Sequence, residues 1–528
     1  MVGVETSSKK NSERDLPPCG PTQPSGASGA FTLMGGTLVS RLTGLLRNSL
    51  LNQLFPQTVT DAFTVAFKVP NLFRELLAEG ALTNSFVPIY RGQSQPEARR
   101  LAGALAGMLF LVNGILLLIT TLAAPWVVRL LLGSEGSVDF ELAVQLTRVV
   151  FPFLAAISFS ALAMGVLQAN ERFIGPAWAP VALNVVTVVL MLVFPSQAVP
   201  LALAFVFGAV AQFLIQIPFL VRYKLLPKLG HFWHPELAVV LILMVPFAFT
   251  TGARQVLNVI STRILDSLEA GSQTAFFNAD LFLSLALGLF SISPALAYYS
   301  RLSANASEQP AAFSKTLLEG LRLIAFFSAP AGLLLLIVPD AAVNSVLNWI
   351  TAFQPGIGAN PLTLELSADA LAPLGLAVFP LGVSNLLMRT FYIRREVRWP
   401  IAVTAIFIIS SGVLYALLVP PLGIVGMSWG LVIAAWLQFI LLLVIVTRRE
   451  RFHWAAFCRY AIAVLGIAGF ACGVAYLILQ VVPIATNWVG FFTRAVLATG
   501  VLGAVYLFIS SFFGFSEIQR LRIGRYSR

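Results

Sequence analysis

Long apolar segments separated by short polar loops run through most of the 528-residue chain. About 20 consecutive apolar residues suffice to cross the hydrocarbon core of a bilayer as a helix. On this criterion the sequence predicts fourteen helices, of which 61–90, 273–299 and 367–392 are interrupted by polar residues. We therefore expect an all-α polytopic membrane protein. The predicted helices are 31–54, 61–90, 101–132, 143–168, 176–194, 199–222, 238–266, 273–299, 314–338, 367–392, 400–419, 424–447, 456–480 and 489–513.

Lysine and arginine occur in every second predicted loop and are absent from the loops between. Loops 133–142, 195–198, 267–272, 339–366, 420–423 and 481–488 contain neither residue. Because basic residues concentrate in cytoplasmic loops, the alternate set of loops is expected to face the cytoplasm. An even number of helices then places both termini there. The basic set comprises Arg91, Arg99, Arg100, Arg172, Arg222, Lys224, Lys228, Arg301, Arg394, Arg395, Arg398, Arg448, Arg449 and Arg451.

An internal repeat suggests how the helices are organised. At an offset of 226 residues, Gln212 aligns with Gln438 and Arg222 with Arg448. Repeated halves are common in transporters. The sequence therefore predicts two pseudo-symmetric six-helix lobes and a C-terminal helix pair between two polar ends. The predicted parts are a disordered cytoplasmic N-terminus (1–30), an N-lobe (31–222), a C-lobe (238–447), a helix pair (456–513) and a basic cytoplasmic tail (514–528).

Composition excludes several classes of protein. Hydrophobic residues make up 58% of the chain and charged residues only 11%, which is far from a soluble multidomain protein. The formal charge of +11 resides in short loops and forms no basic domain, so no nucleic-acid partner is expected. Histidine and cysteine lack metal-ligand spacing, and no glycine-rich nucleotide loop occurs. We expect no metal, no cofactor and no enzymatic activity.

Charged residues at bilayer depth mark the candidate site, because burying each one there is costly. SRLTGLLRN (40–48) contains Arg41 and Arg47, and the next predicted helix presents Phe67, Asn71 and Arg74 as one stripe. The arginine fork matches phosphate oxygens in a bidentate manner, so the cluster indicates an anionic headgroup. Alternatively, the arginines pair with acidic residues to lock the helices together. Those acids are Asp61, Glu75 and Glu79.

These residues also carry a family resemblance. SRLTGLLRN, PNLFRELLAEGA, FVPIY, RFIGPAWAPVALN (172–184) and MRTFYIRREVRWP (388–400) resemble the MurJ/MviN lipid II flippases of the multidrug/oligosaccharidyl-lipid/polysaccharide exporter superfamily. The resemblance implies a fourteen-helix protein of the bacterial inner membrane. It also implies that the chain moves an undecaprenyl pyrophosphate carrying a disaccharide pentapeptide to the outer leaflet by alternating access, in peptidoglycan biosynthesis.

The resemblance also implies roles for particular residues. Arg41, Arg47 and Arg74 would engage the pyrophosphate, and Ser40 would line the same cavity. The chain departs from the family pattern at two positions. Asn48, itself a candidate for binding the headgroup, stands where the family usually has an acid, and Leu281 stands where an arginine usually follows the aspartate at Asp280.

The missing arginine leaves several assignments open. Arg254 or Arg263 is a candidate to replace its charge, and the alternative is that they pair with Asp266 or reach the membrane surface. Asp61, Glu79 and Asp280 are candidates for cation coupling or for simple pairing.

Three alternative functions follow from the same residues. In the first, the chain is a flippase for another lipid-linked oligosaccharide. In the second, it is a non-transporting scaffold that recruits cell-wall synthesis proteins. A drug or sodium antiporter fits less well, because three arginines suit an anion better than a cation. The expected partners are lipid II or a similar glycan lipid, membrane lipids and cell-wall synthesis proteins.

Overall fold

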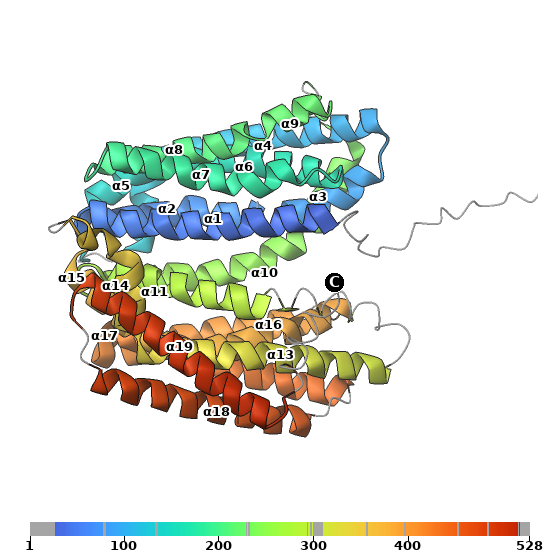
Figure 1. The fold of residues 1–528 in the computed structure, drawn as a ribbon. Helices are drawn as coiled ribbons and strands as arrows, with labels where there is room; N and C mark the ends of the chain where they lie inside the picture. The colour runs from blue at the N-terminus through green and yellow to red at the C-terminus, as the bar shows by residue number, and fades with distance from the viewer. Residues whose placement is uncertain are drawn as a thin grey trace, which may run out of the picture.

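The computed structural model is helical almost throughout and contains no β-strand in the part of the chain that it describes (Figure 1). The predicted all-α class is therefore confirmed. The described residues are 27–77, 81–132, 136–228, 230, 233–292, 294–295, 298, 302, 310–354, 357–394, 396, 398–450, 454–482, 485–515 and 517.

Helices of the first half of the chain pack side by side as one group (Figure 1). Two predicted helices are broken at prolines, which lack the backbone N–H that a helix interior needs. One break precedes Pro152 and the other precedes Pro218. The helices of this half are α1 (Ala27–Leu54), α2 (Gln57–Leu77), α3 (Ala81–Arg91), α4 (Gln95–Leu131), α5 (Phe140–Val150), α6 (Pro152–Ala169), α7 (Ile174–Val193), α8 (Ala198–Leu214) and α9 (Ile217–Arg222).

The second half is less regular. α15 and α16 are bent by 53° relative to each other, and α17 contains two predicted helices joined at Gly423, where φ is +57°. Glycine adopts this left-handed backbone without a steric penalty. The elements are α10 (Pro235–Asp266), α11 (Ser272–Leu287), the π-helix η1 (Gly288–Ile292), α13 (Pro310–Ile337), α14 (Pro339–Leu347), the 3-10 helix η2 (Trp349–Ala352), α15 (Pro361–Gly375), α16 (Val378–Ile393), α17 (Arg398–Glu450), α18 (Trp454–Val481) and α19 (Trp488–Phe512).

Many of these helices are suited to a membrane. Within the described residues, nine helical segments are long and apolar enough to cross one, and the bent pair α15 and α16 makes a tenth. α17 is counted once in that total although it contains two predicted helices. The chain is thus a multi-pass membrane protein, and the predicted number of fourteen is approximate.

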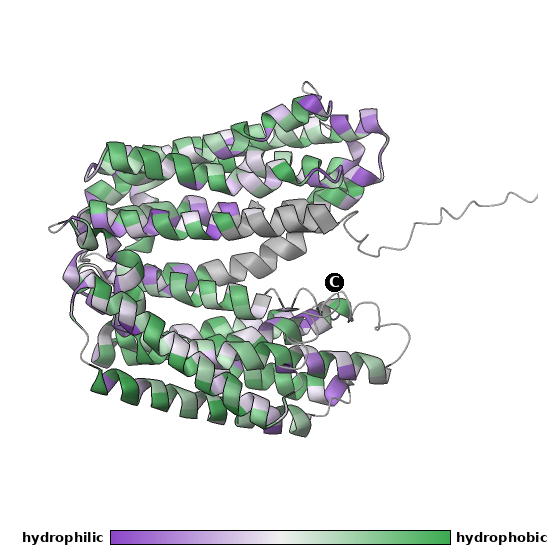
Figure 2. Ribbon diagram, in the orientation of Figure 1, coloured by the Kyte–Doolittle hydropathy of each residue, from purple (hydrophilic) through white to green (hydrophobic). Residues whose placement is uncertain are grey.

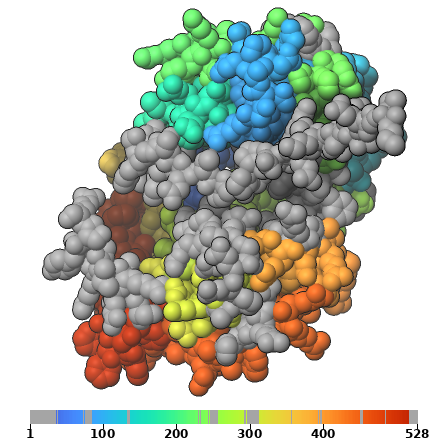
Figure 3. Space-filling model, turned by 90° about the vertical axis from the view of Figure 1, so that its right-hand side faces the viewer, coloured from blue at the N-terminus to red at the C-terminus, as the bar shows by residue number. Residues whose placement is uncertain are grey.

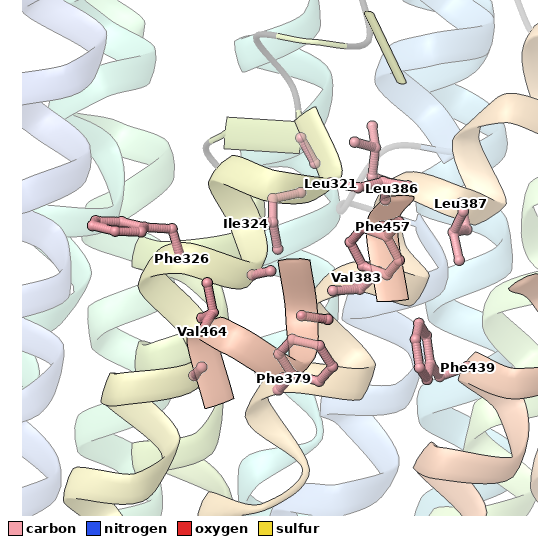
Figure 4. Packing of buried hydrophobic residues seen from close by; sticks show 14 of the residues in the cluster. Leu321, Ile324, Phe326, Phe379, Val383, Leu386, Leu387, Phe439, Phe457 and Val464 are labelled. Carbon is pink, nitrogen blue, oxygen red and sulfur yellow. The ribbon is translucent and has the colours of Figure 1, made fainter. Parts of the chain in front are cut away.

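Apolar side chains hold the last two helices to the second half. Phe326 of α13, Phe379 of α16 and Phe457 of α18 belong to one buried cluster (Figure 4). Tyr506 of α19 joins this cluster and donates a hydrogen bond from its hydroxyl to the carbonyl of Phe326 (2.8 Å). The C-terminal pair is therefore packed on the second half through α13.

Helix α10 connects the two halves. Near its start, Leu237 and Val240 are buried in a cluster with Leu101 of α4. Near its end, Leu257 and Leu265 belong to a cluster of the second half. The helix therefore contributes to both halves, and the predicted lobe boundaries stay a prediction.

The two sets of loops lie at opposite ends of the molecule. Loops without lysine or arginine, including those before α5, α8 and α11, lie at the left end in Figure 1. The first basic loops lie at the other end, where α1 begins and α19 ends. Figure 3 looks onto that end, with the first half above and the second half below. Hydrophilic residues also occur along α1, between the ends (Figure 2).

Candidate functional site

A cavity of about 320 Å³ lies within the first half, between α1, α2, α6, α7 and α8. Polar side chains supply part of its lining, and apolar side chains form the rest. The polar residues are Ser40, Arg47, Asn71, Arg74, Asn184 and Gln212. The apolar residues are Phe67, Phe153, Ile157, Ala161, Met164, Pro180 and Leu183.

Arg47 of α1 is held in this cavity by two neutral amides. Its Nη1 donates to Oδ1 of Asn184 (2.9 Å), and its Nε and Nη2 donate to Oδ1 of Asn48 (3.3 and 3.2 Å). The guanidinium carbon also lies 5.0 Å from the ring centroid of Phe205, within cation–π range. Within the described residues no carboxylate pairs with Arg47. The side chain is thus fixed while its positive charge is retained.

The hydrogen-bond capacity of Arg47 is only partly used. A guanidinium has five N–H donors, and three of them are engaged by the amide oxygens. Two donors remain available to a ligand in the cavity. An oxyanion with several acceptor oxygens matches this arrangement, because charge-assisted hydrogen bonds to arginine are the strong ones.

Asn184 of α7 joins α7 to α1 at this point. Its Nδ2 donates to the carbonyl of Ser40 (3.0 Å) and to Oγ1 of Thr43 (3.2 Å). Gly44 lies beside this amide, where a Cβ would meet Nδ2 of Asn184 at an ordinary van der Waals distance of 3.4 Å. The amide therefore has both ends engaged, and it sets the direction of Arg47.

Arg74 reaches the same cavity from α2. Its Nε donates to Oδ1 of Asn71 (2.9 Å), one turn earlier on the helix. Phe67, Asn71 and Arg74 all line the cavity, so the predicted stripe on α2 is confirmed as a geometric feature. The structure thus brings Arg47 and Arg74 into one space.

Arg41 points elsewhere. Six residues of an α-helix turn through about 600°, so Arg41 and Arg47 lie about 120° apart around α1. The guanidinium of Arg41 lies against Gly288, where a Cβ would collide with it. Gly288 begins the π-helix of the second half, and such irregular turns often occur at functional sites. The three predicted arginines therefore do not converge within the cavity, since Arg41 bridges to the other half.

A polar seam joins the two halves at the end without basic loops. Asp61 of α2 accepts hydrogen bonds from the backbone N–H of Gly271 (2.6 Å) and from the N–H and hydroxyl of Thr274 (3.0 and 2.6 Å). A carboxylate at the N-terminus of α11 also interacts favourably with the helix dipole. Lys68 of α2 donates to Oγ1 of Thr262 (2.6 Å) and Oε1 of Gln273 (3.2 Å).

Neutral groups continue the seam along α1. Asn52 and Asn278 exchange two amide hydrogen bonds (3.1 and 2.8 Å). Ser49 donates to the carbonyl of Val346 (2.6 Å), and Gln53 accepts from the N–H of Ile350 (2.7 Å). Each bond links the first half to the second. The seam, defined as Ser49, Asn52, Gln53, Asp61 and Lys68 with these partners, closes this end of the molecule.

The remaining predicted site residues lie outside the cavity. Asn48 is buried and orients Arg47 without lining the space. Asp280 is exposed on α11, with Leu281 half-buried beside it, and Arg263 is exposed near the end of α10. The side chain of Arg254 and the whole of Glu79 are outside the described residues.

Two polar cavity residues, Asn184 and Gln212, were not predicted as site residues. Asn184 occurs in RFIGPAWAPVALN, one of the segments that carries the family resemblance. Gln212 is one of the residues matched by the internal repeat. A single amide in an apolar helix does not indicate whether its side chain faces a neighbouring helix, a cavity or the membrane. Both signals were present, but only the packing of α7 against α1, and of α8 against α6 and α7, assigns them to the site.

Comparisons with known proteins show to which family the chain is related. A lipid II flippase MurJ from Burkholderia cenocepacia is 29% identical over 94% of this chain and 98% of its own length. A probable lipid II flippase MurJ from Bdellovibrio bacteriovorus is 30% identical over 78% of this chain and 80% of its own.

Solved structures show the same fold. A lipid II flippase MurJ in an inward closed conformation has a TM-score of 0.77 at 19% identity, covering 92% of this chain and 99% of that one. An inward-facing MATE family transporter of the MOP superfamily has a TM-score of 0.65 at 16% identity, covering 81% and 99%. The family model described as lipid II flippase MurJ matches residues 51–498. The chain therefore belongs to the MurJ family.

Proposed function

We propose that this protein is a lipid II flippase. It moves the undecaprenyl pyrophosphate-linked headgroup from the inner to the outer leaflet of the bacterial cytoplasmic membrane, and it makes or breaks no covalent bond. The observation that carries the proposal is the amide-held Arg47, which lines a cavity together with Arg74. The family relationship supports the identity of the cargo.

The chemistry of the cavity suits a pyrophosphate. Phosphate oxygens accept several hydrogen bonds in a plane, and the arginine fork donates them in matching geometry. A guanidinium stays protonated even when it is poorly solvated, so its attraction for an anion persists inside a membrane protein. We assign Arg47 and Arg74 to the pyrophosphate, Ser40 to the cavity wall, and Asn48 and Asn184 to the orientation of Arg47.

Arg41 has a separate role in this proposal. It extends from α1 to Gly288 of the second half, so it approaches the headgroup from the side where the two halves face each other. The guanidinium would then respond to the relative position of the halves. Arg254 stays a candidate for replacing the arginine that the family usually carries at the position of Leu281. The exposed position of Arg263 favours a surface role, whereas Asp280 lies near enough to Lys68 of the first half to attract its charge.

The polar seam sets the direction of access. It joins the halves at the end whose loops lack lysine and arginine, and positive loops are expected on the cytoplasmic side. We infer that the seam lies on the outer side and that both termini lie in the cytoplasm. In this conformation the headgroup would enter from the inner leaflet. Breaking the seam and closing the opposite end would release it outside.

The function is tested in a bacterium whose own lipid II flippase is depleted. This chain is expressed there, and lipid II accessible at the outer face is measured. Wild type is expected to restore accessible lipid II, and Arg47→Ala at equal membrane abundance is not. An inserted wild-type protein that restores none would overturn the lipid II assignment.

A further inference from the structure

Gln212 places a hydrogen-bond acceptor on the wall of the cavity that α8 provides. The residue is only 8% exposed, and it lines the same space as Arg47 and Arg74. Its amide nitrogen donates to Oγ of Ser160 on α6 (3.1 Å). That bond directs the nitrogen into the packing between α6 and α8.

A neighbouring amide fixes this orientation. Nε2 of Gln216 donates to Oγ of Ser160 (2.7 Å), to the carbonyl of Ser160 (3.3 Å) and to the carbonyl of Gln212 (2.9 Å). The Ser160 hydroxyl directs its own proton toward the Gln212 carbonyl (3.5 Å), so Oγ serves as acceptor for both amides. Ser160 and Gln216 therefore fix the Gln212 side chain on the side that faces away from the cavity.

The side-chain oxygen of Gln212 is left for the cavity. Across the described part of the chain, Oε1 accepts no hydrogen bond, and it is not among the fully buried polar atoms that lack a partner. An amide oxygen accepts from hydroxyl or N–H groups. Arg47 and Arg74 supply the opposite chemistry, since they only donate. The cavity thus combines cationic donors for an anion with a neutral acceptor for an uncharged group.

The size of the cavity limits what occupies it. About 320 Å³ is at the low end of the range for small-molecule sites, so only part of a large glycan headgroup fits. The apolar side chains of Phe153, Ile157 and Met164 complete the wall between the polar groups. A phosphate with the adjoining sugar has the required combination of charge, hydroxyl or amide donors, and a partly apolar ring face.

The geometry points to Gln212 as a specificity residue that accepts a hydrogen bond from a hydroxyl or acetamido N–H of the glycan attached to the pyrophosphate. This inference rests on the proposed function, because it assumes that the arginines hold the pyrophosphate. It makes a separate claim, namely that the first half of the chain senses whether a sugar is present on the carrier lipid.

The test compares two lipids with the purified full-length chain in lipid nanodiscs. One lipid is undecaprenyl pyrophosphate, and the other carries the disaccharide pentapeptide. Gln212→Met removes the acceptor at similar length and is expected to lower affinity for the glycan-bearing lipid by about fivefold to tenfold, with little change for the bare carrier. Arg47→Ala is expected to lower affinity for both lipids.

Gln438→Met is the matched control. Gln438 is also buried, occupies the repeat-related position in the second half, and does not line the cavity. This variant is expected to bind both lipids as wild type does. If Gln212→Met does not fold, Gln212→Glu replaces it, because a carboxylate keeps an acceptor oxygen. The ratio of the two affinities should then stay near that of wild type, even if both fall through repulsion of the pyrophosphate.

The outcomes separate the two proposals. Equal losses for both lipids in Gln212→Met, or no loss for either, would overturn the role of Gln212 while leaving the flippase function intact. A changed affinity ratio in Gln212→Glu would do the same. A wild-type protein that binds neither lipid would refute the proposed function, and the specificity role would fall with it.

Discussion

The polar seam and the cavity use similar residues for different purposes. In the seam, Asp61 and Lys68 carry opposite charges on one helix, and each bonds to neutral groups of the opposite half. In the cavity, Arg47 is bound by two amides of its own half, and neither amide neutralises it. The polar groups of the seam join the two halves, whereas the positive charge of Arg47 in the cavity remains available to a ligand.

This difference between the seam and the cavity distinguishes side chains that bind a ligand from side chains that hold the helices together. A buried charge is costly unless it is paired and hydrogen-bonded. Asp61 is well hydrogen-bonded, since its carboxylate accepts from three donors at the start of α11, and Lys68 supplies an opposite charge on the same helix. Arg47 is oriented, but its charge lacks an acidic counterpart among the described residues. An anionic ligand in the cavity would supply the negative charge that Arg47 lacks. We therefore expect mutations in the two regions to change different observables.

Arg47→Ala should have the largest effect. Removing two free donors and the charge should lower the affinity for undecaprenyl pyrophosphate by about 100-fold or more, because each of the two hydrogen bonds to a charged group contributes about 1.5–3 kcal/mol. Lipid binding in nanodiscs measures this effect. Arg263→Ala, which removes an exposed arginine outside the cavity, is the control and should bind like wild type. Equal losses in the two variants would argue that overall charge, and not the cavity, governs binding.

Asp61→Asn should weaken the seam without removing cavity groups. The amide nitrogen of the new asparagine would face N–H and hydroxyl donors that bond to the carboxylate in wild type. The free energy that stabilises the closed form should therefore fall by about 1–3 kcal/mol. Spin labels at the exposed Ser196 and Gln354 report the separation of the halves at this end. Longer distances should become populated in the variant, after Cys19, Cys458 and Cys472 are replaced in all samples.

Asp139→Asn is the matched control for the seam. Asp139 caps α5 within the first half, where it accepts from the N–H of Leu142 (3.0 Å). Its replacement should leave the label distances unchanged, since no bond between the halves is lost. A distance distribution that is the same in wild type and Asp61→Asn would remove Asp61 from the closing of this end.

Asn184→Leu should produce an intermediate effect on the cavity. Arg47 would lose its bond to Oδ1, and Ser40 would lose a donor to its carbonyl. A net contribution of about 1 kcal/mol per hydrogen bond predicts a threefold to tenfold fall in pyrophosphate affinity. Asn113→Leu is the comparison, because that buried amide bonds within the first half away from the cavity. If both variants lose affinity equally, Asn184 acts through stability alone.

Gly288→Ala should have the smallest effect. The added methyl group would displace the Arg41 guanidinium, which sits at the end of a flexible side chain, so folding should be little affected. We expect transport to fall about twofold to fivefold, in proportion to a weakened single contact. Gly114→Ala in α4 meets open space and should be neutral. Flipping rates in reconstituted vesicles distinguish the two, and an unchanged rate for Gly288→Ala would make the Arg41 contact dispensable.

Much of the fold was predictable from the sequence. Apolar segment lengths indicate the helices, and the alternation of basic loops separates the two ends of the molecule that Figure 1 shows. Breaks such as those before Pro152 and Pro218 were harder, because proline is tolerated in membrane helices when neighbours satisfy the backbone. The 3.6-residue period also placed Phe67, Asn71 and Arg74 on one face of α2.

The candidate site was only partly predictable. The sequence singled out Arg41, Arg47 and Arg74, but helix periodicity does not say which neighbouring helix each face meets. Contacts between α1 and α7 direct Arg47 to Asn184, and the juxtaposition of α1 with η1 directs Arg41 to Gly288. The partner of Asp61 lies 210 residues away in sequence at Gly271. Such pairings depend on the assembly of the two halves, which no local pattern encodes.

The most direct measurement follows lipid II itself in vesicles that contain only the purified chain. Fluorescent lipid II is placed in both leaflets, and a membrane-impermeant quencher reports the fraction that reaches the outside over time. Our account predicts that wild-type protein makes the inner-leaflet pool accessible and that Arg47→Ala vesicles behave like protein-free ones. Wild-type vesicles that leave the inner pool protected, or Arg47→Ala vesicles that flip as fast as wild type, would contradict the claim that the amide-held arginine carries the headgroup.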